Sequence, residues 1–126
     1  MLSKTDVDML EKLTGQLEAH HKEIGALAKR SPVDAVNPFK LKFINSTLAE
    51  SNTFLGAENR PFSEFEVFET DDVPSNSDVT FMLASYLQAI EKFRADNIVR
   101  DGAGWYYRMD QQESKIRTSP PAKLKD

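Results

Sequence analysis

The chain has 126 residues, no cysteine and a net charge of −4. This length favours one domain with its own core, because a chain of this size buries roughly two-thirds of its unfolded surface. The lack of cysteine excludes a disulfide scaffold, thiolate metal sites and a cysteine nucleophile. The first residues lack the apolar stretch of a signal peptide and no apolar run is long enough to cross a bilayer, so we expect a cytoplasmic protein.

Charge is distributed unevenly along the sequence. Residues 1–56 and residues 79–99 are each neutral, whereas residues 57–78 hold seven acids against one arginine, a net charge of −6. Residues 100–126 carry a net charge of +2. Local blocks of this kind can steer a partner or pair with each other, and they say little about the fold.

A first helix is predicted from about Thr5 to Arg30. Its apolar residues recur at heptad positions a and d through three repeats: Leu10, Leu13, Leu17, Ile24 and Leu27, with His20 at one d position. Thr5 or Asp6 is the expected N-terminal cap, and Ser31-Pro32 ends the helix. The seam fits the inside of a bundle or could be partly shared with a second copy, so a homodimer through this helix stays open.

Two further helices follow. The second is predicted to start near Pro38, with Asn37 as its cap, and to stop at Gly56. The third is predicted to follow Ser77 as a cap and to run through about Asn97. Its apolar face is the richest of the three: Val79, Leu83, Tyr86, Leu87, Ile90 and Phe93. The expected fold class is therefore mainly α, a three-helix antiparallel bundle.

The connection between the second and third helices, residues 57–76, is both acidic and aromatic. It is long for a segment without structure in a compact domain, so part of it should pack. Phe62, Phe65 and Phe68 follow Pro61 at a spacing of three, which fits one face of a short helical turn. An extended strand with alternate residues on opposite faces fits the same segment.

The C-terminal part predicts a short β-hairpin. Residues 105–109 are rich in the aromatic residues that favour strands, and they follow a glycine-rich turn at residues 101–104. Residues 115–118 are expected to return beside them. The single helical domain with this hairpin thus spans residues 1–118, and the double proline in residues 119–126 predicts a flexible tail rich in proline and lysine.

Catalytic and metal-binding sets are incomplete in this sequence. His20 and His21 are adjacent on a helix and point about 100° apart, so they do not serve one simple site. Glu18 and His21 form a Glu-x-x-His pair like those of di-metal helical bundles, but a symmetric copy would have to supply the second pair. No Gly-x-Ser-x-Gly and no phosphate-binding loop occurs. We therefore expect a protein that is not an enzyme and has no metal or cofactor.

The acidic and aromatic connection is the sharpest local feature. Exposed phenylalanines ringed by charge would make a docking surface with an aromatic anchor and a steering rim. The opposite interpretation is that at least two rings cover the helices and only the acids face water. We expect an adaptor or assembly subunit of a cytoplasmic complex that docks a protein partner through residues 57–78. The residues predicted to bind this partner are Phe62, Phe65, Phe68, Glu64, Glu66, Asp71 and Asp72.

The basic aromatic segment 105–125 supports an alternative function, because it mixes aromatic faces with cations as proteins that bind single-stranded nucleic acids do. A nucleic-acid accessory protein would use Trp105, Tyr107, Arg108, Lys115, Arg117, Lys123 and Lys125. Four acids dilute the bases of this region, and an isoelectric point of about 5.2 also counts against this function. A hairpin that closes one end of the bundle explains Trp105 and Tyr107 equally well.

Overall fold

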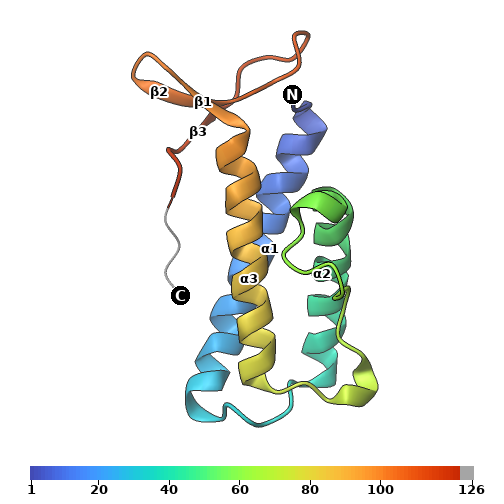
Figure 1. Ribbon diagram of the computed structural model, residues 1–126. Coiled ribbons are helices and arrows are strands. Elements are labelled where there is room, and N and C mark those ends of the chain that lie inside the picture. Colours follow the sequence, from blue (N-terminus) through green and yellow to red (C-terminus); the bar gives the residue numbers. More distant parts are fainter. Residues whose placement is uncertain (123–126) are drawn as a thin grey trace.

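Three long helices carry a small sheet at one end (Figure 1) in the computed structural model, which describes residues 1–122. The helices are α1 (Lys4–Arg30), α2 (Pro38–Asn59) and α3 (Asn76–Asp96), and a 3₁₀ turn, η1 (Thr70–Asp72), precedes α3. The strands are β1 (Ile98–Asp101), β2 (Gly104–Tyr107) and β3 (Arg117–Thr118). The predicted class, a mainly α bundle of three helices with a C-terminal hairpin, is confirmed.

The first helix begins with a reciprocal cap. The Ser3 hydroxyl accepts a hydrogen bond from the Asp6 backbone N–H at 3.1 Å, and the Asp6 carboxylate accepts one from the Ser3 N–H at 2.9 Å. This capping box satisfies two N–H groups that the first turn leaves without helical partners. The expected cap, Thr5 or Asp6, is therefore wrong: Ser3 is the cap, and Asp6 acts from inside the first turn.

The second helix starts where it was predicted and breaks at its expected stop. The Asn37 side chain accepts hydrogen bonds from the N–H groups of Phe39 and Lys40, and Pro38 occupies the first turn. Gly56 has φ +74° and ψ 174°, which interrupts the regular helix before one last turn to Asn59. That backbone conformation belongs almost only to glycine, so this residue fixes the direction in which the chain leaves α2.

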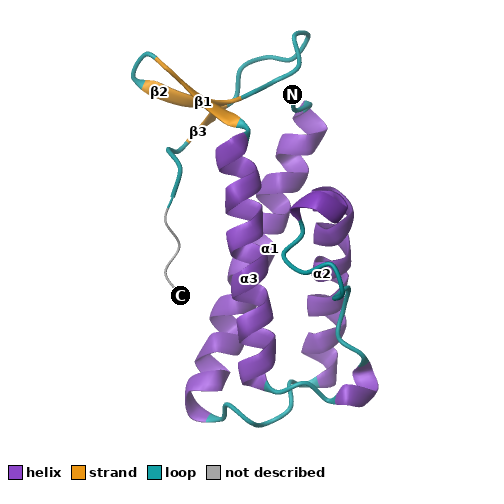
Figure 2. Ribbon diagram, viewed as in Figure 1, coloured by secondary structure: helices purple, strands orange, loops and turns teal. Residues whose placement is uncertain are grey.

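The direction of the helices depends on the connection, which returns along the bundle before α3 begins (Figure 2). The segments before α2 and α3 meet at the same end: the Val36 N–H donates to the Pro74 carbonyl at 2.9 Å, and the Asn76 N–H donates to the Asp34 carbonyl at 2.8 Å. Consequently α1 is antiparallel to both other helices, whereas α2 and α3 run parallel (Figure 1). The cap of α3 is Ser75, two residues before the expected Ser77.

The sheet is antiparallel, in the order β1-β2-β3. The predicted hairpin is present in the pairing of Trp105 with Thr118 and Tyr106 with Arg117, while β1 was not expected. The N-terminal residues join this end of the molecule, because the Leu2 N–H donates to the Arg108 carbonyl at 2.7 Å. The sheet therefore closes the end of the bundle at which α1 begins and α3 stops (Figure 1).

One apolar core runs through all three helices and reaches the sheet. The helices contribute the buried side chains Val7, Leu10, Leu13, Leu17, Ile24, Leu41, Ile44, Leu48, Leu55, Val79, Leu83, Tyr86 and Ile90. Loops and strands add Leu2, Val36, Ile98, Tyr107 and Met109. Four seam residues of α1 are fully buried within this one chain and Leu27 is partly buried against them, so little of the seam is left for a second copy. Within residues 1–122, none of the helices has the length and apolar composition needed to cross a membrane.

Candidate functional site

The acidic connection is fastened to α2 by two asparagines that lie two helical turns apart. Asn45 donates from Nδ2 to the Phe68 carbonyl at 2.9 Å and accepts at Oδ1 from the Phe68 N–H at 3.0 Å. Asn52 donates to the Glu66 carbonyl at 2.8 Å and accepts from the Tyr86 hydroxyl at 2.6 Å. These amides give an irregular backbone the partners that a helix or sheet would otherwise supply.

Two of the three phenylalanines of the connection pack on the core. The rings of Phe65 and Phe68 meet edge to face at 5.0 Å, and Phe65 also contacts the ring of Tyr86, at 6.3 Å. Both are partly buried against core side chains, which confirms that at least two rings cover the helices. Within residues 60–69 neither the short helical turn nor the strand forms, because asparagine side chains replace regular backbone pairing.

The third ring, Phe62, is half-buried and belongs to an aromatic pair whose other member faces solvent. It stacks on Phe81 of α3, with ring centroids 6.3 Å apart and planes inclined by 23°. Phe81 is 62% exposed, one of the most exposed large apolar side chains of α3. Helical spacing could have indicated this exposure, because Phe81 lies two positions from both Val79 and Leu83 and so about 200° around the helix from each core position. A hollow of about 610 Å³ adjoins Phe62 between Arg60, Ser85 and Ala89.

The seven carboxylates of this region are not neutralised. Glu58, Glu64, Glu66, Glu69, Asp71, Asp72 and Asp78 are all exposed. Within residues 1–122, none of them forms an ion pair, since all six ion pairs lie elsewhere. The one base of the segment, Arg60, donates to the Ser63 carbonyl at 2.6 Å instead. The net charge of −6 thus faces solvent.

A strained residue stands beside these acids. Val73 follows η1 with φ +47° and ψ +61°, in the left-handed region, and its side chain is 61% exposed. A β-branched residue in this region is a clear outlier that costs roughly 1–3 kcal/mol. The backbone is held on both sides, by the Val73 N–H donating to Thr70 and by the Pro74 carbonyl accepting from Val36. Val73 thus holds an exposed apolar side chain on a strained backbone.

We call the outer part of this region the connection surface. It comprises the half-buried Phe62 and the exposed residues Glu58, Glu64, Glu66, Glu69, Asp71, Asp72, Val73, Asp78 and Phe81. Of the residues predicted to bind a partner, Phe62 and the four acids contribute to it. Phe65 and Phe68 instead support it from beneath, since they are packed on the core.

The residues of the nucleic-acid alternative are mostly engaged within the fold. Tyr107 is buried, and burial raises the pKa of its hydroxyl. Trp105 packs against the core. Lys115 pairs with Asp101 and lies 5.0 Å over the Tyr106 ring. Arg108 donates to the Ile98 carbonyl at 3.3 Å and Arg117 is exposed, while Lys123 and Lys125 lie outside the described residues.

Arg94, which the sequence did not single out, holds the start of the expected flexible tail. It is only 8% exposed, and its guanidinium donates to both Glu91 carboxylate oxygens at 2.7 and 2.9 Å. Its other donors bind the Thr118 hydroxyl and the carbonyls of Ser119 and Pro120, at 2.8 to 2.9 Å. All five N–H donors of the guanidinium are thereby used, and residues 119–122 are anchored to α3.

The histidines of α1 do not belong to a group of metal ligands within residues 1–122. His20 Nε2 lies 3.0 Å from the hydroxyl of the buried Thr47, and burial lowers the pKa of this histidine. Glu18 is exposed and His21 is half-buried. In the part of the chain that the structure describes, no three His, Asp or Glu side chains gather where they could hold a metal ion.

Comparison with known proteins adds no family to these observations. No protein-family model, no curated protein and no solved structure matches the chain.

Proposed function

We propose that the protein is a non-catalytic interaction subunit of a cytoplasmic assembly and that it binds a basic protein partner through the connection surface. The observation that carries this proposal is the combination of seven exposed carboxylates without an ion pair in residues 1–122 and the Phe62–Phe81 pair, of which Phe81 is exposed. Charge and apolar anchor are thus adjacent, as they are in surfaces that first steer a partner and then hold it.

The acids supply long-range attraction. A block with net charge −6 raises the rate at which a positively charged partner arrives, and salt weakens this effect because the carboxylates are exposed. Exposed charge pairs add little affinity by themselves. The partner should therefore present lysines or arginines around at least one apolar side chain.

The aromatic pair and Val73 supply the apolar contact. Covering an exposed phenylalanine removes apolar area from water, and such rings dominate the energy of many interfaces. The surface is also preorganised, because Asn45 and Asn52 fix the connection on α2 before any partner arrives. A preordered segment avoids part of the entropy cost that a disordered acidic loop would carry on binding.

The test begins with an affinity-tagged copy recovered from the native host at low salt, with half of the sample treated with nuclease. The basic partner identified by mass spectrometry is then purified and titrated with the wild-type protein and variants. Phe81→Ser should weaken binding at least about tenfold, and Asp71→Asn with Asp72→Asn should reduce the association rate and its salt dependence. Phe39→Ser, which changes an exposed phenylalanine of α2, is the matched control and should bind normally.

Two results would contradict this function. Partner binding that survives Phe81→Ser and the neutralised acids would show that another surface is used. Loss of every co-purifying molecule on nuclease treatment would redirect the assignment to the bases of the C-terminal segment, beginning with Arg117.

A further inference from the structure

The Arg60 guanidinium leaves most of its hydrogen-bonding capacity unused. Its Nη2 donates to the Ser63 carbonyl at 2.6 Å, and this is the single acceptor that the guanidinium meets within residues 1–122. The Nε atom is buried and has no acceptor in this part of the chain. The guanidinium of Arg94 differs, because every one of its N–H donors is bonded. A buried donor without a partner is unfavourable, so Arg60 is suited to an acceptor that the described chain does not supply.

None of the carboxylates near Arg60 neutralises its charge. Ion pairs within residues 1–122 do not include Arg60, although residues 57–78 contain seven acids. Glu58 and Glu66 line the two hollows that adjoin Arg60, but both are exposed and neither pairs with it. The positive charge of Arg60 is thus available to a bound molecule.

The larger of these hollows, of about 610 Å³, lies between the end of α2 and α3. Gly56 breaks α2, and the Arg60 N–H donates to the Gly56 carbonyl at 3.2 Å, so this bend determines where Arg60 leaves the helix. From α3, Ala89 and Lys92 line the hollow, and Lys92 already pairs with Asp96 at 2.8 Å. Arg60 is therefore the cation that remains to orient a ligand of this size.

Two aromatic rings form apolar walls of this hollow. Phe62 stacks on Phe81, and Phe93 meets Phe54 edge to face with ring centroids 5.0 Å apart. Each ring is held by a neighbouring ring, so the walls are in place before any ligand arrives. Preformed apolar walls with one oriented polar group are typical of sites for small organic molecules.

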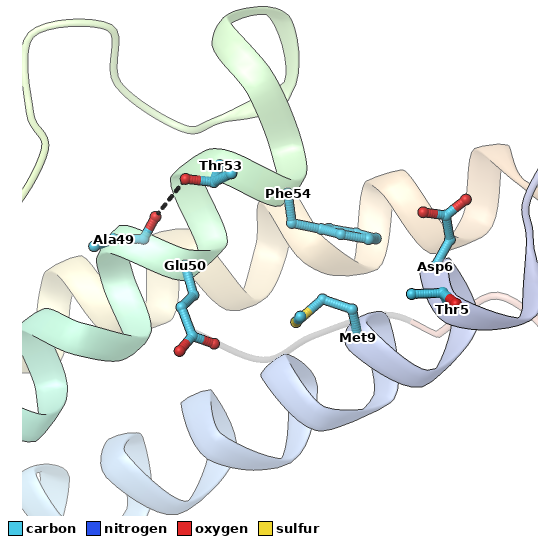
Figure 3. Close-up of a pocket in the computed structure, with 7 residues that line it drawn as sticks. All are labelled: Thr5, Asp6, Met9, Ala49, Glu50, Thr53 and Phe54. Atoms are coloured by element: carbon cyan, nitrogen blue, oxygen red, sulfur yellow. Dashed lines mark hydrogen bonds between the residues drawn. The ribbon is translucent and has the colours of Figure 1, made fainter.

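The hollow between α1 and α2 offers no comparable polar group. Its volume is about 410 Å³, and Figure 3 shows Met9 of α1 and Phe54 of α2 projecting into the space between the two helices. The carboxylate of Asp6 is engaged in the cap of α1, and Glu50 pairs with Lys12 at 3.4 Å. These charged groups are already bonded, so they are not left to orient a ligand.

We infer that the hollow beside Arg60 binds a small aromatic carboxylate. The carboxylate accepts hydrogen bonds from the guanidinium, whose planar fork matches two carboxylate oxygens, and the ring of the ligand packs between Phe62 and Phe93. A carboxylate suits the hollow better than a phosphate, because Glu58 at its edge repels a second negative charge and its walls are apolar. This site goes beyond the proposed function, since Arg60 lies outside the connection surface and no protein partner is needed to fill it.

Titration with phenylacetate tests the site, with the Arg60 Nε–H resonance in a two-dimensional NMR spectrum as the readout. That resonance is assigned by its absence in Arg60→Gln. Phenylacetate should shift it saturably, and the uncharged phenylacetamide should bind at least about tenfold more weakly because it lacks the charge-assisted hydrogen bonds. No saturable shift with phenylacetate, equal affinity for phenylacetamide, or a shift with inorganic phosphate alone would overturn the inference.

Variants locate the ligand in the hollow. Arg60→Gln should weaken phenylacetate binding at least about tenfold, as measured by ligand-observed NMR. Ala89→Leu should also weaken it, because the larger side chain occupies part of the hollow. Arg100→Gln is the matched control and should bind normally, since it changes an exposed arginine whose Nε donates to the Gly102 carbonyl. Circular dichroism checks that each variant keeps its helices, and binding that survives both Arg60→Gln and Ala89→Leu would overturn the inference.

Discussion

Gly56 and Gly15 should respond in opposite directions to the same substitution. Gly56 has φ +74° and ψ 174°, so an alanine there is strained by about 1–3 kcal/mol. Gly15 lies within α1, where alanine should stabilise the helix by about 1 kcal/mol. An added Cβ would meet no atom within 4 Å at either position, so the difference comes from the backbone alone.

The two variants should therefore differ by about 2–4 kcal/mol in the free energy of unfolding, or about 8–16 °C in Tm. Urea and thermal unfolding followed by circular dichroism measure both quantities. The double variant should show the sum of the two effects, since the sites are independent. A Gly56→Ala protein as stable as wild type would refute the reasoning, because residue 56 would then be regular helix and the connection would leave α2 in another direction.

Three further results are expected. Burial lowers the pKa of His20 below 6.5, so the unfolded chain binds the proton more readily and the free energy of unfolding should fall as the pH drops below about 6.5. Urea midpoints of wild type and His20→Gln across this pH range measure the effect, and the same dependence of the midpoint on pH in the variant would contradict it. Arg94→Met should lower the free energy of unfolding by about 3 kcal/mol, because it leaves the Glu91 carboxylate unpaired and half-buried. It should also make residues 118–122 sensitive to protease, and equal protection of these residues in the variant would show that Arg94 does not anchor them. Phe65→Ser should lower the free energy of unfolding by about 2 kcal/mol, less than the same substitution of a fully buried phenylalanine, whereas Phe62→Ser should lower it by under about 1 kcal/mol. Equal losses in unfolding experiments would mean that the two rings are buried alike.

The helices were predictable because each has a local signature. Leu10, Leu13 and Leu17 recur at helical spacing and are fully buried as that spacing implies. Asn37 before Pro38 marks the start of α2, and the cap bonds to Phe39 and Lys40 follow from that pair. Such signals depend on a few neighbouring residues.

The direction of α3 was harder to predict from the sequence, although the length of the connection is compatible with the observed direction. Residues 60–75 can span about 50 Å when extended, more than the roughly 33 Å length of α2. They can therefore return along the whole helix, which makes α2 and α3 parallel. Choosing between a return and a compact turn requires knowing that Asn45 and Asn52 bind the connection, and such distant pairings leave no periodic pattern.

The candidate site was predictable in its charge and only partly in its anchor. The acids of residues 57–78 could be counted directly, and they remain exposed. Phe65 and Phe68 are equally apolar in the sequence, yet they pack on the core because Tyr86 lies beneath them. The exposed aromatic side chain of the connection surface is instead Phe81 of α3. Arg94 binds a tail that meets α3 only after the sheet has formed, so no local sequence pattern predicts its role.

The bonds that join Leu2 to Arg108 and Asp110, far apart in the sequence, have a consequence for biosynthesis. The Leu2 N–H donates to the Arg108 carbonyl, and the Asp110 N–H donates to the Leu2 carbonyl at 2.8 Å. A ribosome adds about 5–20 residues per second, so Leu2 waits roughly 5–20 s for these partners to be made. During that interval the helices can associate, but the end of the core that contains Ile98 and Met109 stays open. The nascent chain therefore completes its fold only after the last strands have left the ribosome.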